Sequence, residues 1–196
     1  MMADDRLEFL PENVLAPEQG RLLVSEPFLS DPYFRRSVVL LCEYGPDGAF
    51  GFMLNRSLDM AINDLLEGVP PLRTSVCIGG PVQSSDLFYL HTFGSRLQGS
   101  APILGDIHLG GDPDQLRAIL RTDPDLAKYV RFFVGYSGWS AGQLDQEIND
   151  RSWLIASADK RAIMGHDHKD LWSNTLKAMG SAFAPLANFP EDPRHN

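Results

Sequence analysis

Long hydrophobic runs are absent from this sequence of 196 residues. The longest strongly apolar run, Val38 to Cys42, is far shorter than the roughly 20 residues that a membrane-spanning helix needs. No basic stretch followed by an apolar stretch, the pattern of a secretory signal peptide, opens the chain. We therefore expect a cytoplasmic protein without a membrane partner.

Positive charge is scarce, with 17 Lys and Arg residues against 26 Asp and Glu residues and a net charge of −9. Contacts between basic side chains and phosphates supply most of the affinity for nucleic acids. A protein this acidic repels a polyanion unless it carries a local basic patch. We therefore expect no direct binding of nucleic acid.

Cysteine is scarce as well. Both cysteines, Cys42 and Cys77, lie within apolar runs, where a free thiol behaves as a small buried hydrophobic group. We expect a buried, reduced pair. The other composition values, 43% hydrophobic and 22% charged, are ordinary for a globular domain. We predict a loosely ordered arm at 1–20, a single domain at 21–184 and a flexible tail at 185–196.

Short apolar runs separated by turn residues predict an α+β fold with helices packed on a mixed sheet. The strands expected at 36–43 and 49–55 flank a Gly-Pro-Asp-Gly turn and should form an early antiparallel hairpin. The pattern at 60–67 favours a short helix. Asp112 followed by Pro113 is a strong signal for the start of another helix.

The stretch from Phe132 to Ile148 is the centre of the expected fold. It predicts a strand at 129–134, a tight turn at Gly135 and Gly138, and a helix at 141–149. Ser140 and Gln143 have the spacing of a capping box that opens such a helix. A second glycine corner, Gly79-Gly80, follows the strand expected at 74–78.

Four blocks of sequence stand out: Asp31-Pro-Tyr-Phe-Arg-Arg-Ser-Val-Val-Leu-Leu41, Gly51-Phe-Met-Leu-Asn-Arg56, Gly79-Gly-Pro-Val82 and Gly135-Tyr-Ser-Gly-Trp-Ser-Ala-Gly-Gln-Leu144. Together they resemble the YqgE/AlgH family over nearly the whole chain. The resemblance implies a small bacterial cytoplasmic protein of α/β architecture, with a transcription-regulator label tied to alginate production. The chain departs from the family at Tyr44, Ser57 and Ser137, where the family usually has His, Pro and Ala.

A nucleophilic serine is one hypothesis for the central motif, because Ser137 follows a predicted strand at a glycine turn. The G-x-S-x-G pattern fails, however, since Trp139 stands where the last glycine should be. No histidine identifies itself as the base that a serine nucleophile needs. The alternative is that Gly135 and Gly138 serve backbone geometry, while Tyr136 and Trp139 fill the core or the wall of a cleft.

An anion-binding cleft is the second hypothesis, because helix N-termini and glycine corners expose N–H groups and Arg35 lies near other arginines at strand or turn ends. We expect no cofactor and no metal, and interpret His166-Asp167-His168 as a polar loop. The candidate cleft residues are Arg36, Asn55, Arg56, Gly79, Gly80, Gly135, Tyr136, Gly138, Trp139 and Gln143.

The function predicted from these residues and from the resemblance is a non-enzymatic binding or regulatory protein. Its partner would be another protein or a small anionic ligand. A small-molecule enzyme that uses the same glycine- and arginine-lined cleft is the alternative. We assign no catalytic residue, and Asp145, Glu147 and Asp150 are expected to form a solvated helix face.

Overall fold

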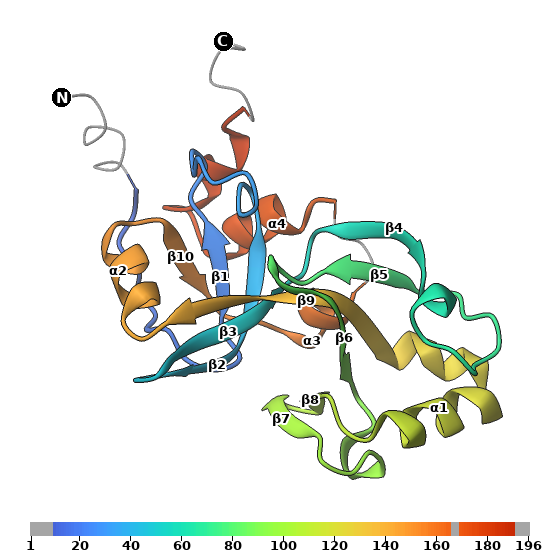
Figure 1. Ribbon diagram of the computed structural model, residues 1–196. Coiled ribbons are helices and arrows are strands. Elements are labelled where there is room, and N and C mark those ends of the chain that lie inside the picture. Colours follow the sequence, from blue (N-terminus) through green and yellow to red (C-terminus); the bar gives the residue numbers. More distant parts are fainter. Residues whose placement is uncertain (1–9, 166–168, 191–196) are drawn as a thin grey trace.

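A computed structural model describes residues 10–165 and 169–190, and Figure 1 shows how their elements are arranged. The described residues form ten strands in one mixed sheet, with short helices packed on it, which confirms the predicted α+β class. The strands are β1 Leu22–Ser25, β2 Val38–Gly45, β3 Gly48–Met53, β4 Ser57–Ala61, β5 Ser75–Ile78, β6 Val82–His91, β7 Ala101–Leu104, β8 Ile107–Leu109, β9 Val130–Ser140 and β10 Trp153–Ala156. The α-helices are α1 Pro113–Thr122, α2 Gln143–Asn149, α3 Lys160–Met164 and α4 Leu171–Ala178, and the 3-10 helices are η1 Ile62–Asp64, η2 Gly94–Arg96, η3 Pro124–Tyr129 and η4 Ala184–Asn188.

Strand β9 holds the two halves of the sheet together. Its second half pairs antiparallel with β3, from Ser140 opposite Gly48 to Ser137 opposite Gly51. Its first half pairs parallel with β5 and antiparallel with β6. In Figure 1 this strand runs across the molecule, with β10, β1, β2 and β3 at one end and α1 at the other. The sequence motif expected to be central is therefore the structural centre.

The predicted end of this strand at residue 134 is wrong, because β9 continues to Ser140. Gly135 does not turn the chain back; its positive φ of 67° lets the strand bend between its two halves. The residues beyond it find a hydrogen-bonding partner in β3, far earlier in the sequence. Local sequence patterns do not show such a partner, and for this reason the sequence predicts a turn at these glycines.

The early antiparallel hairpin is confirmed. Strands β2 and β3 pair from Val39 opposite Met53 to Gly45 opposite Gly48, with a bulge between Leu41 and Glu43. The unbroken apolar centre of β2 predicts burial on both faces, and the strand lies between β1 and β3 with its first five residues buried.

Buried residues gather in three clusters. One lies between the sheet and the C-terminal helices and contains Trp172 and Leu176 of α4. A second lies between β9 and α1 and contains Leu116 and Leu120. The third lies beneath α2 and includes Trp139. The helices thus cover different parts of the sheet.

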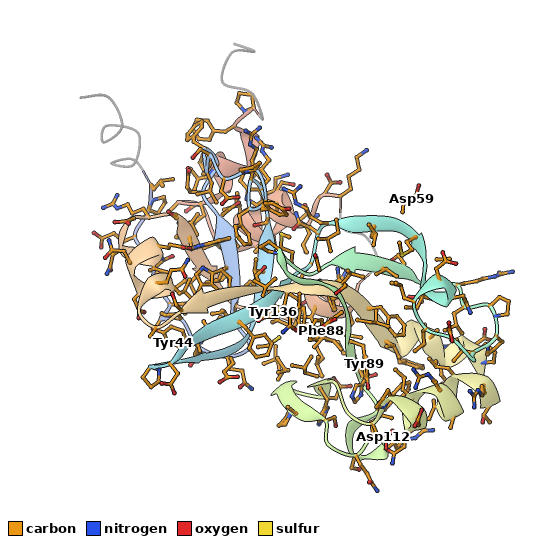
Figure 2. The ribbon with its side chains drawn as sticks, in the orientation of Figure 1. Tyr44, Asp59, Phe88, Tyr89, Asp112 and Tyr136 are labelled. Atoms are coloured by element: carbon orange, nitrogen blue, oxygen red, sulfur yellow. The ribbon has the colours of Figure 1, made fainter. Side chains whose placement is uncertain are left out.

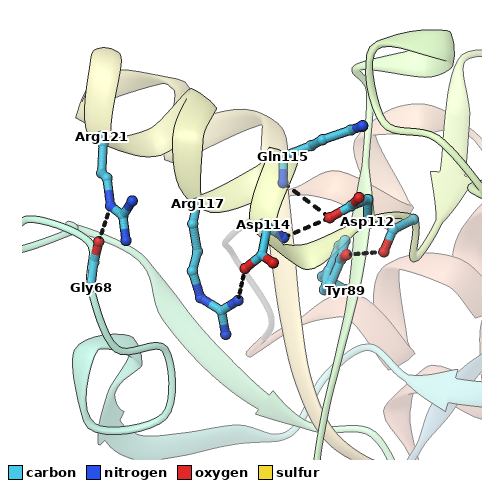
Figure 3. A network of polar contacts seen from close by, with 8 residues as sticks. Gly68, Tyr89, Asp112, Asp114, Gln115, Arg117 and Arg121 are labelled. Atoms are coloured by element: carbon cyan, nitrogen blue, oxygen red, sulfur yellow. Dashed lines mark hydrogen bonds and ion pairs between the residues drawn. The ribbon is translucent and has the colours of Figure 1, made fainter.

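Helix α1 begins as the sequence predicts. The Asp112 carboxylate accepts hydrogen bonds from the backbone N–H groups of Asp114 and Gln115, at 2.8 and 3.2 Å, and Pro113 occupies the first turn. Figure 3 shows this cap together with the side chain of Arg121, which donates to the Gly68 carbonyl and ties the helix to the loop before β5. None of the helices in the described ranges has the length and apolar character to cross a lipid bilayer.

The helix predicted at 60–67 is wrong. Strand β4 occupies its start, and the short 3-10 helix η1 follows. Leu58 pairs opposite Val76 of β5, and this tertiary pairing outweighs the local helical pattern. Ile62 is nevertheless fully buried, because η1 turns it into the second core cluster.

Both ends of the described chain, residues 10 and 190, lie near residues of the first core cluster. Leu10 is buried in the first core cluster. The Asn13 side chain pairs with the edge of β10: it donates to the Trp153 carbonyl at 3.0 Å and accepts from the Ile155 N–H at 2.7 Å. Near the other end, Leu186 is buried in the same cluster as Leu10.

Candidate functional site

The candidate cleft residues do not line a single cleft. Three of them, Arg36, Asn55 and Arg56, line one hollow. We call it the arginine hollow; its volume is about 960 Å³. It forms between the loop before β2, the end of β3 and the start of α4. Its polar and aromatic lining includes Arg35, Arg36, Asn55, Arg56, Lys169, Asp170 and Trp172.

Side-chain contacts hold Arg36 in the wall of this hollow. The guanidinium lies over the Trp172 ring, 4.6 Å from its centroid, and donates to the carbonyl of Phe189. Its backbone has a positive φ of 50°, which non-glycine residues rarely adopt. Arg36 Nε is buried and has no hydrogen-bond partner among the described residues. Such an unsatisfied donor is uncommon in a protein interior.

Asn55 and Arg56 hold the loop that carries Arg36. The Asn55 amide accepts from the N–H of Val38 at 2.9 Å and donates to the Arg36 carbonyl at 2.7 Å. Arg56 donates to the carbonyls of Pro32 and Arg35, at 3.3 and 3.0 Å. Asn55 therefore has a bracing role, while Arg56 both braces the loop and contributes its charge to the hollow.

The charge of the arginine hollow is opposite to that of the whole chain. Four cationic side chains, Arg35, Arg36, Arg56 and Lys169, surround one carboxylate, Asp170. Within residues 10–165 and 169–190, none of these four cations forms an ion pair. Four cations against one carboxylate leave the lining with a net positive charge. The hollow can therefore attract an anion into a protein of net charge −9.

The two glycine corners meet, but they pack against each other rather than around a ligand. A Cβ atom on Gly79 would lie 2.2 Å from the Gly135 carbonyl oxygen, and one on Gly80 would lie 2.1 Å from the carbonyl carbon of Tyr136. The N–H of Gly79 donates to Val134 O at 2.8 Å. These glycines permit two backbone segments to cross in contact, which accounts for their presence without an anion.

A second hollow, which we call the aromatic pocket, has a volume of about 580 Å³. It lies between the β2–β3 hairpin, β6 and the second half of β9, and it contains the candidate residues Tyr136 and Gly138. Trp139 borders it, but the Trp139 indole belongs to the third core cluster. The side chains that line the pocket include Phe50, Phe88, Tyr136, Glu43 and Asp47.

A third hollow, the apolar groove, has a volume of about 350 Å³. Gly80 borders it, together with the apolar side chains of Tyr33, Leu58, Met60 and Leu65. Tyr33 and Met60 are among the exposed large apolar residues of the protein. The groove shares Ile78 with the arginine hollow, so the two hollows adjoin.

Trp139 and Gln143 converge on Glu147, which sequence reasoning placed on a solvated helix face. That placement is wrong for Glu147, which lies on the half-buried side of α2. Its Oε2 accepts from the indole N–H groups of Trp139 at 2.8 Å and Trp153 at 2.7 Å, and its Oε1 accepts from Gln143 at 2.9 Å. Gln143 also accepts from the N–H of Ser140 at 3.1 Å, as in a capping box. These contacts join β9, α2 and β10.

The position of Ser137 argues against a nucleophile. It is fully buried, and its Oγ donates to the carbonyl of Gly79 at 3.0 Å. His91 is also fully buried, and its ring nitrogens contact backbone groups of Phe93 and Gly110. Burial raises the pKa of the Cys42 thiol far above its ordinary value, so this thiol is not a nucleophile either.

Metal ligation finds no support in the described ranges, where no group of three His, Cys, Asp or Glu side chains could hold an ion. The predicted polar loop at 166–168 lies outside the described residues. Cys42 and Cys77 are free and buried, as expected.

Sequence reasoning missed Lys169 and Trp172 of the arginine hollow. Both are far along the chain from Arg36, and only the docking of α4 brings them to it. Phe50 and Phe88 of the aromatic pocket were not among the predicted site residues either. The alternation of side chains along a strand shows on which face of the sheet each side chain lies, but it does not show which strand is its neighbour.

Comparisons with known proteins give one consistent family. A family model described as AlgH-like matches residues 22–184. A UPF0301 protein of Bacteroides thetaiotaomicron is 34% identical over 202 residues, which cover 100% of each chain. One of Cytophaga hutchinsonii is 40% identical over 179 residues, which cover 91% of this chain and 98% of the relative.

Two solved structures are similar to the whole fold. The solution structure of the AlgH protein from Pseudomonas aeruginosa has a TM-score of 0.71 and 27% identity, and the match covers 90% of this chain and 97% of that chain. A crystal structure of a Corynebacterium diphtheriae protein has a TM-score of 0.76 and covers 96% of this chain and 100% of that chain. At 24% identity the second comparison supports the fold alone. These names state no reaction and no ligand.

Proposed function

The chain belongs to the AlgH-like family, as its four sequence blocks indicated, and from that premise we propose that it is a non-enzymatic binding protein. Its arginine hollow binds an acidic segment of a partner protein. The observation that carries this proposal is the set of four cations, Arg35, Arg36, Arg56 and Lys169, that line one hollow without an ion pair in the described part of the chain.

The positions of the cations suit a carboxylate ligand. Arg36 is held over Trp172 and Arg56 is held by two carbonyls. Both side chains are therefore partly ordered before a ligand binds, and they lose less rotamer freedom on binding. Arg35 and Lys169 are exposed and can move toward the ligand. Guanidinium groups bind carboxylates in bidentate geometry, which favours Arg over Lys at such a site.

The size of the site favours a chain segment over a single small anion. A volume of about 960 Å³ is at the upper end of small-molecule pockets. The adjoining apolar groove exposes Tyr33 and Met60, which could receive an apolar side chain of the same segment. A segment with acidic residues followed by an apolar residue fits both hollows.

A regulatory role, which the family resemblance suggests, would act through such a protein partner. Direct binding of DNA is not part of the proposal, because the net charge of −9 leaves only a local patch for phosphate contacts. We also propose a cytoplasmic location, which the two free buried thiols fit.

Calorimetry with a hexaglutamate peptide at low ionic strength tests the proposal. The double variant Arg35→Gln/Lys169→Gln should weaken binding by about tenfold, since each exposed ion pair contributes up to about 1 kcal/mol. Both side chains are exposed, and within residues 10–165 and 169–190 neither forms an ion pair. The matched control Arg73→Gln/Lys177→Gln removes the same charge from exposed positions outside the hollow and should have little effect.

Two outcomes would refute this proposal. Equal weakening by both double variants would show that net charge alone attracts the peptide. Tighter binding of tripolyphosphate than of hexaglutamate, lost in the first variant, would show that the hollow is a small-anion site rather than a docking site for a protein segment.

A further inference from the structure

The aromatic pocket has a chemistry that the proposed anion site does not explain. It shares no lining residue with the arginine hollow. Four aromatic residues line it. Trp139 is buried, whereas Phe50, Phe88 and Tyr136 are each only partly buried. Figure 2 shows Phe88 and Tyr136 side by side beneath β9. Aromatic rings that remain partly exposed at one pocket are available to a ligand.

The Tyr136 ring stands nearly at right angles to the rings of Phe50 and Phe88. The Tyr136 ring makes edge contacts with Phe50, at 6.0 Å between centroids and 81°, and with Phe88, at 5.7 Å and 80°. Phe50 and Phe88 each contact Phe52 below them. Because Phe52 is fully buried, these contacts fix the two outer rings from beneath. The walls therefore exist before any ligand binds.

Gly138 keeps the pocket open. It lies directly opposite Phe50 in the β3–β9 pairing, and a Cβ atom there would lie 3.0 Å from Cε2 of the Tyr136 ring. Gly138 does not have a positive φ, so its backbone conformation does not call for glycine. Because Gly138 has no Cβ atom, the space beside the Tyr136 ring stays open.

Two carboxylates lie at the mouth of the same pocket. Glu43 is paired directly opposite Phe50 across the hairpin, and Asp47 lies in the hairpin turn. No Lys or Arg lines the pocket, and in the described part of the chain neither carboxylate forms an ion pair. Acidic groups beside aromatic faces attract a cation that can shed its water, because the ring faces carry negative charge density.

We propose that the aromatic pocket is a binding site for an organic ammonium ion, with Phe50, Phe88 and Tyr136 around the cationic head and Glu43 and Asp47 balancing its charge. A purely apolar ligand would gain nothing from the two carboxylates. A metal ion would gain little from the three rings. The net charge of −9 adds a long-range attraction for cations.

Choline and its uncharged carbon isostere, 3,3-dimethyl-1-butanol, distinguish a cation site from an apolar hollow. In amide NMR titrations choline should shift Gly45, Gly48 and Gly138 in a saturable way. The isostere should bind at least about tenfold more weakly, the ratio that corresponds to a cation–π contribution of roughly 1.4 kcal/mol. Equal binding of the two probes, or no saturable shift at these glycines with choline, would overturn the proposal.

Variants separate the roles of charge, rings and space. Glu43→Gln should weaken choline binding by about threefold, as for an exposed ion pair, while Glu67→Gln, which removes an exposed carboxylate elsewhere, should not. Gly138→Ala should reduce binding by crowding the Tyr136 ring. Tyr136→Leu should reduce it by about tenfold. If Tyr136→Leu does not fold, Glu43→Gln and Gly138→Ala decide: unchanged binding in both would refute the site.

Discussion

Replacing Trp139 tests how β9 is held to α2 and β10. The side chain is only 6% exposed and contacts the rings of Phe34 and Trp153, with centroids 6.1 and 6.0 Å away. Its indole N–H donates to Glu147 at 2.8 Å. Trp139→Ala leaves a cavity and removes this hydrogen bond, and buried aromatic truncations cost about 3 to 5 kcal/mol.

Trp139→Phe separates packing from the hydrogen bond. It keeps a ring in the cluster but removes the donor to Glu147, and a hydrogen bond to a charged group contributes about 1.5 to 3 kcal/mol. The Glu147 carboxylate retains Trp153 and Gln143 as donors, so the loss should fall at the lower end of that range.

Urea unfolding, followed by circular dichroism, measures both variants. With a slope near 2 kcal/mol per molar urea, the midpoint should fall by about 2 M for Trp139→Ala and by less than about 1 M for Trp139→Phe. A double-mutant cycle with Glu147→Gln should show a coupling of at least about 0.5 kcal/mol. An unchanged midpoint for Trp139→Ala would mean that this indole does not hold the elements together, and the interpretation of the motif would be wrong.

Three further predictions follow from individual contacts. Ser137→Ala should cost no more than about 1 kcal/mol of unfolding free energy, because the Gly79 carbonyl still accepts from Met53 N at 2.8 Å; a loss of folding in a thermal melt would contradict this. Gly80→Ala should lower the free energy of unfolding by more than about 4 kcal/mol, because its Cβ would lie 2.1 Å from the Tyr136 backbone, whereas Gly45→Ala, with nothing within 4 Å, should be nearly neutral. Similar urea midpoints for the two variants would refute the backbone crossing. Burial lowers the pKa of His91, so the unfolded state binds a proton more readily than the folded state, and the free energy of unfolding should fall as the pH drops through about 6.5 toward the lower folded pKa. In paired urea titrations between about pH 7.5 and pH 5.5, His91→Gln should lose less stability than the parent protein. An equal loss would assign the pH dependence to other groups.

Local signals in the sequence predicted much of the fold. The Asp112 cap and the β2–β3 hairpin appear where the residues place them. These elements depend on contacts between neighbours in the sequence, which single-chain patterns report. The errors at 60–67 and beyond residue 134 have a shared cause: β4 and the second half of β9 exist because distant strands pair with them.

The candidate site was predicted only in parts, for the same reason. The sequence identified Arg36 and Arg56 and the two glycine corners, and the corners do meet in space. It could not show that the corners fill each other's space, or that Lys169 and Trp172 complete the arginine hollow from α4. A sequence shows the charge and type of each residue, but residues come to line the same hollow only when the helices and strands that carry them pack together.

An amide NMR titration of the whole protein with hexaglutamate tests the central claim most directly. The proposal predicts that the shifted resonances cluster at residues 31–37, 55–57 and 169–173, and that added salt reverses the shifts, because exposed charge pairs are screened. Shifts spread over basic residues across the surface, or shifts confined to the aromatic pocket, would contradict the claim that the arginine hollow binds an acidic segment.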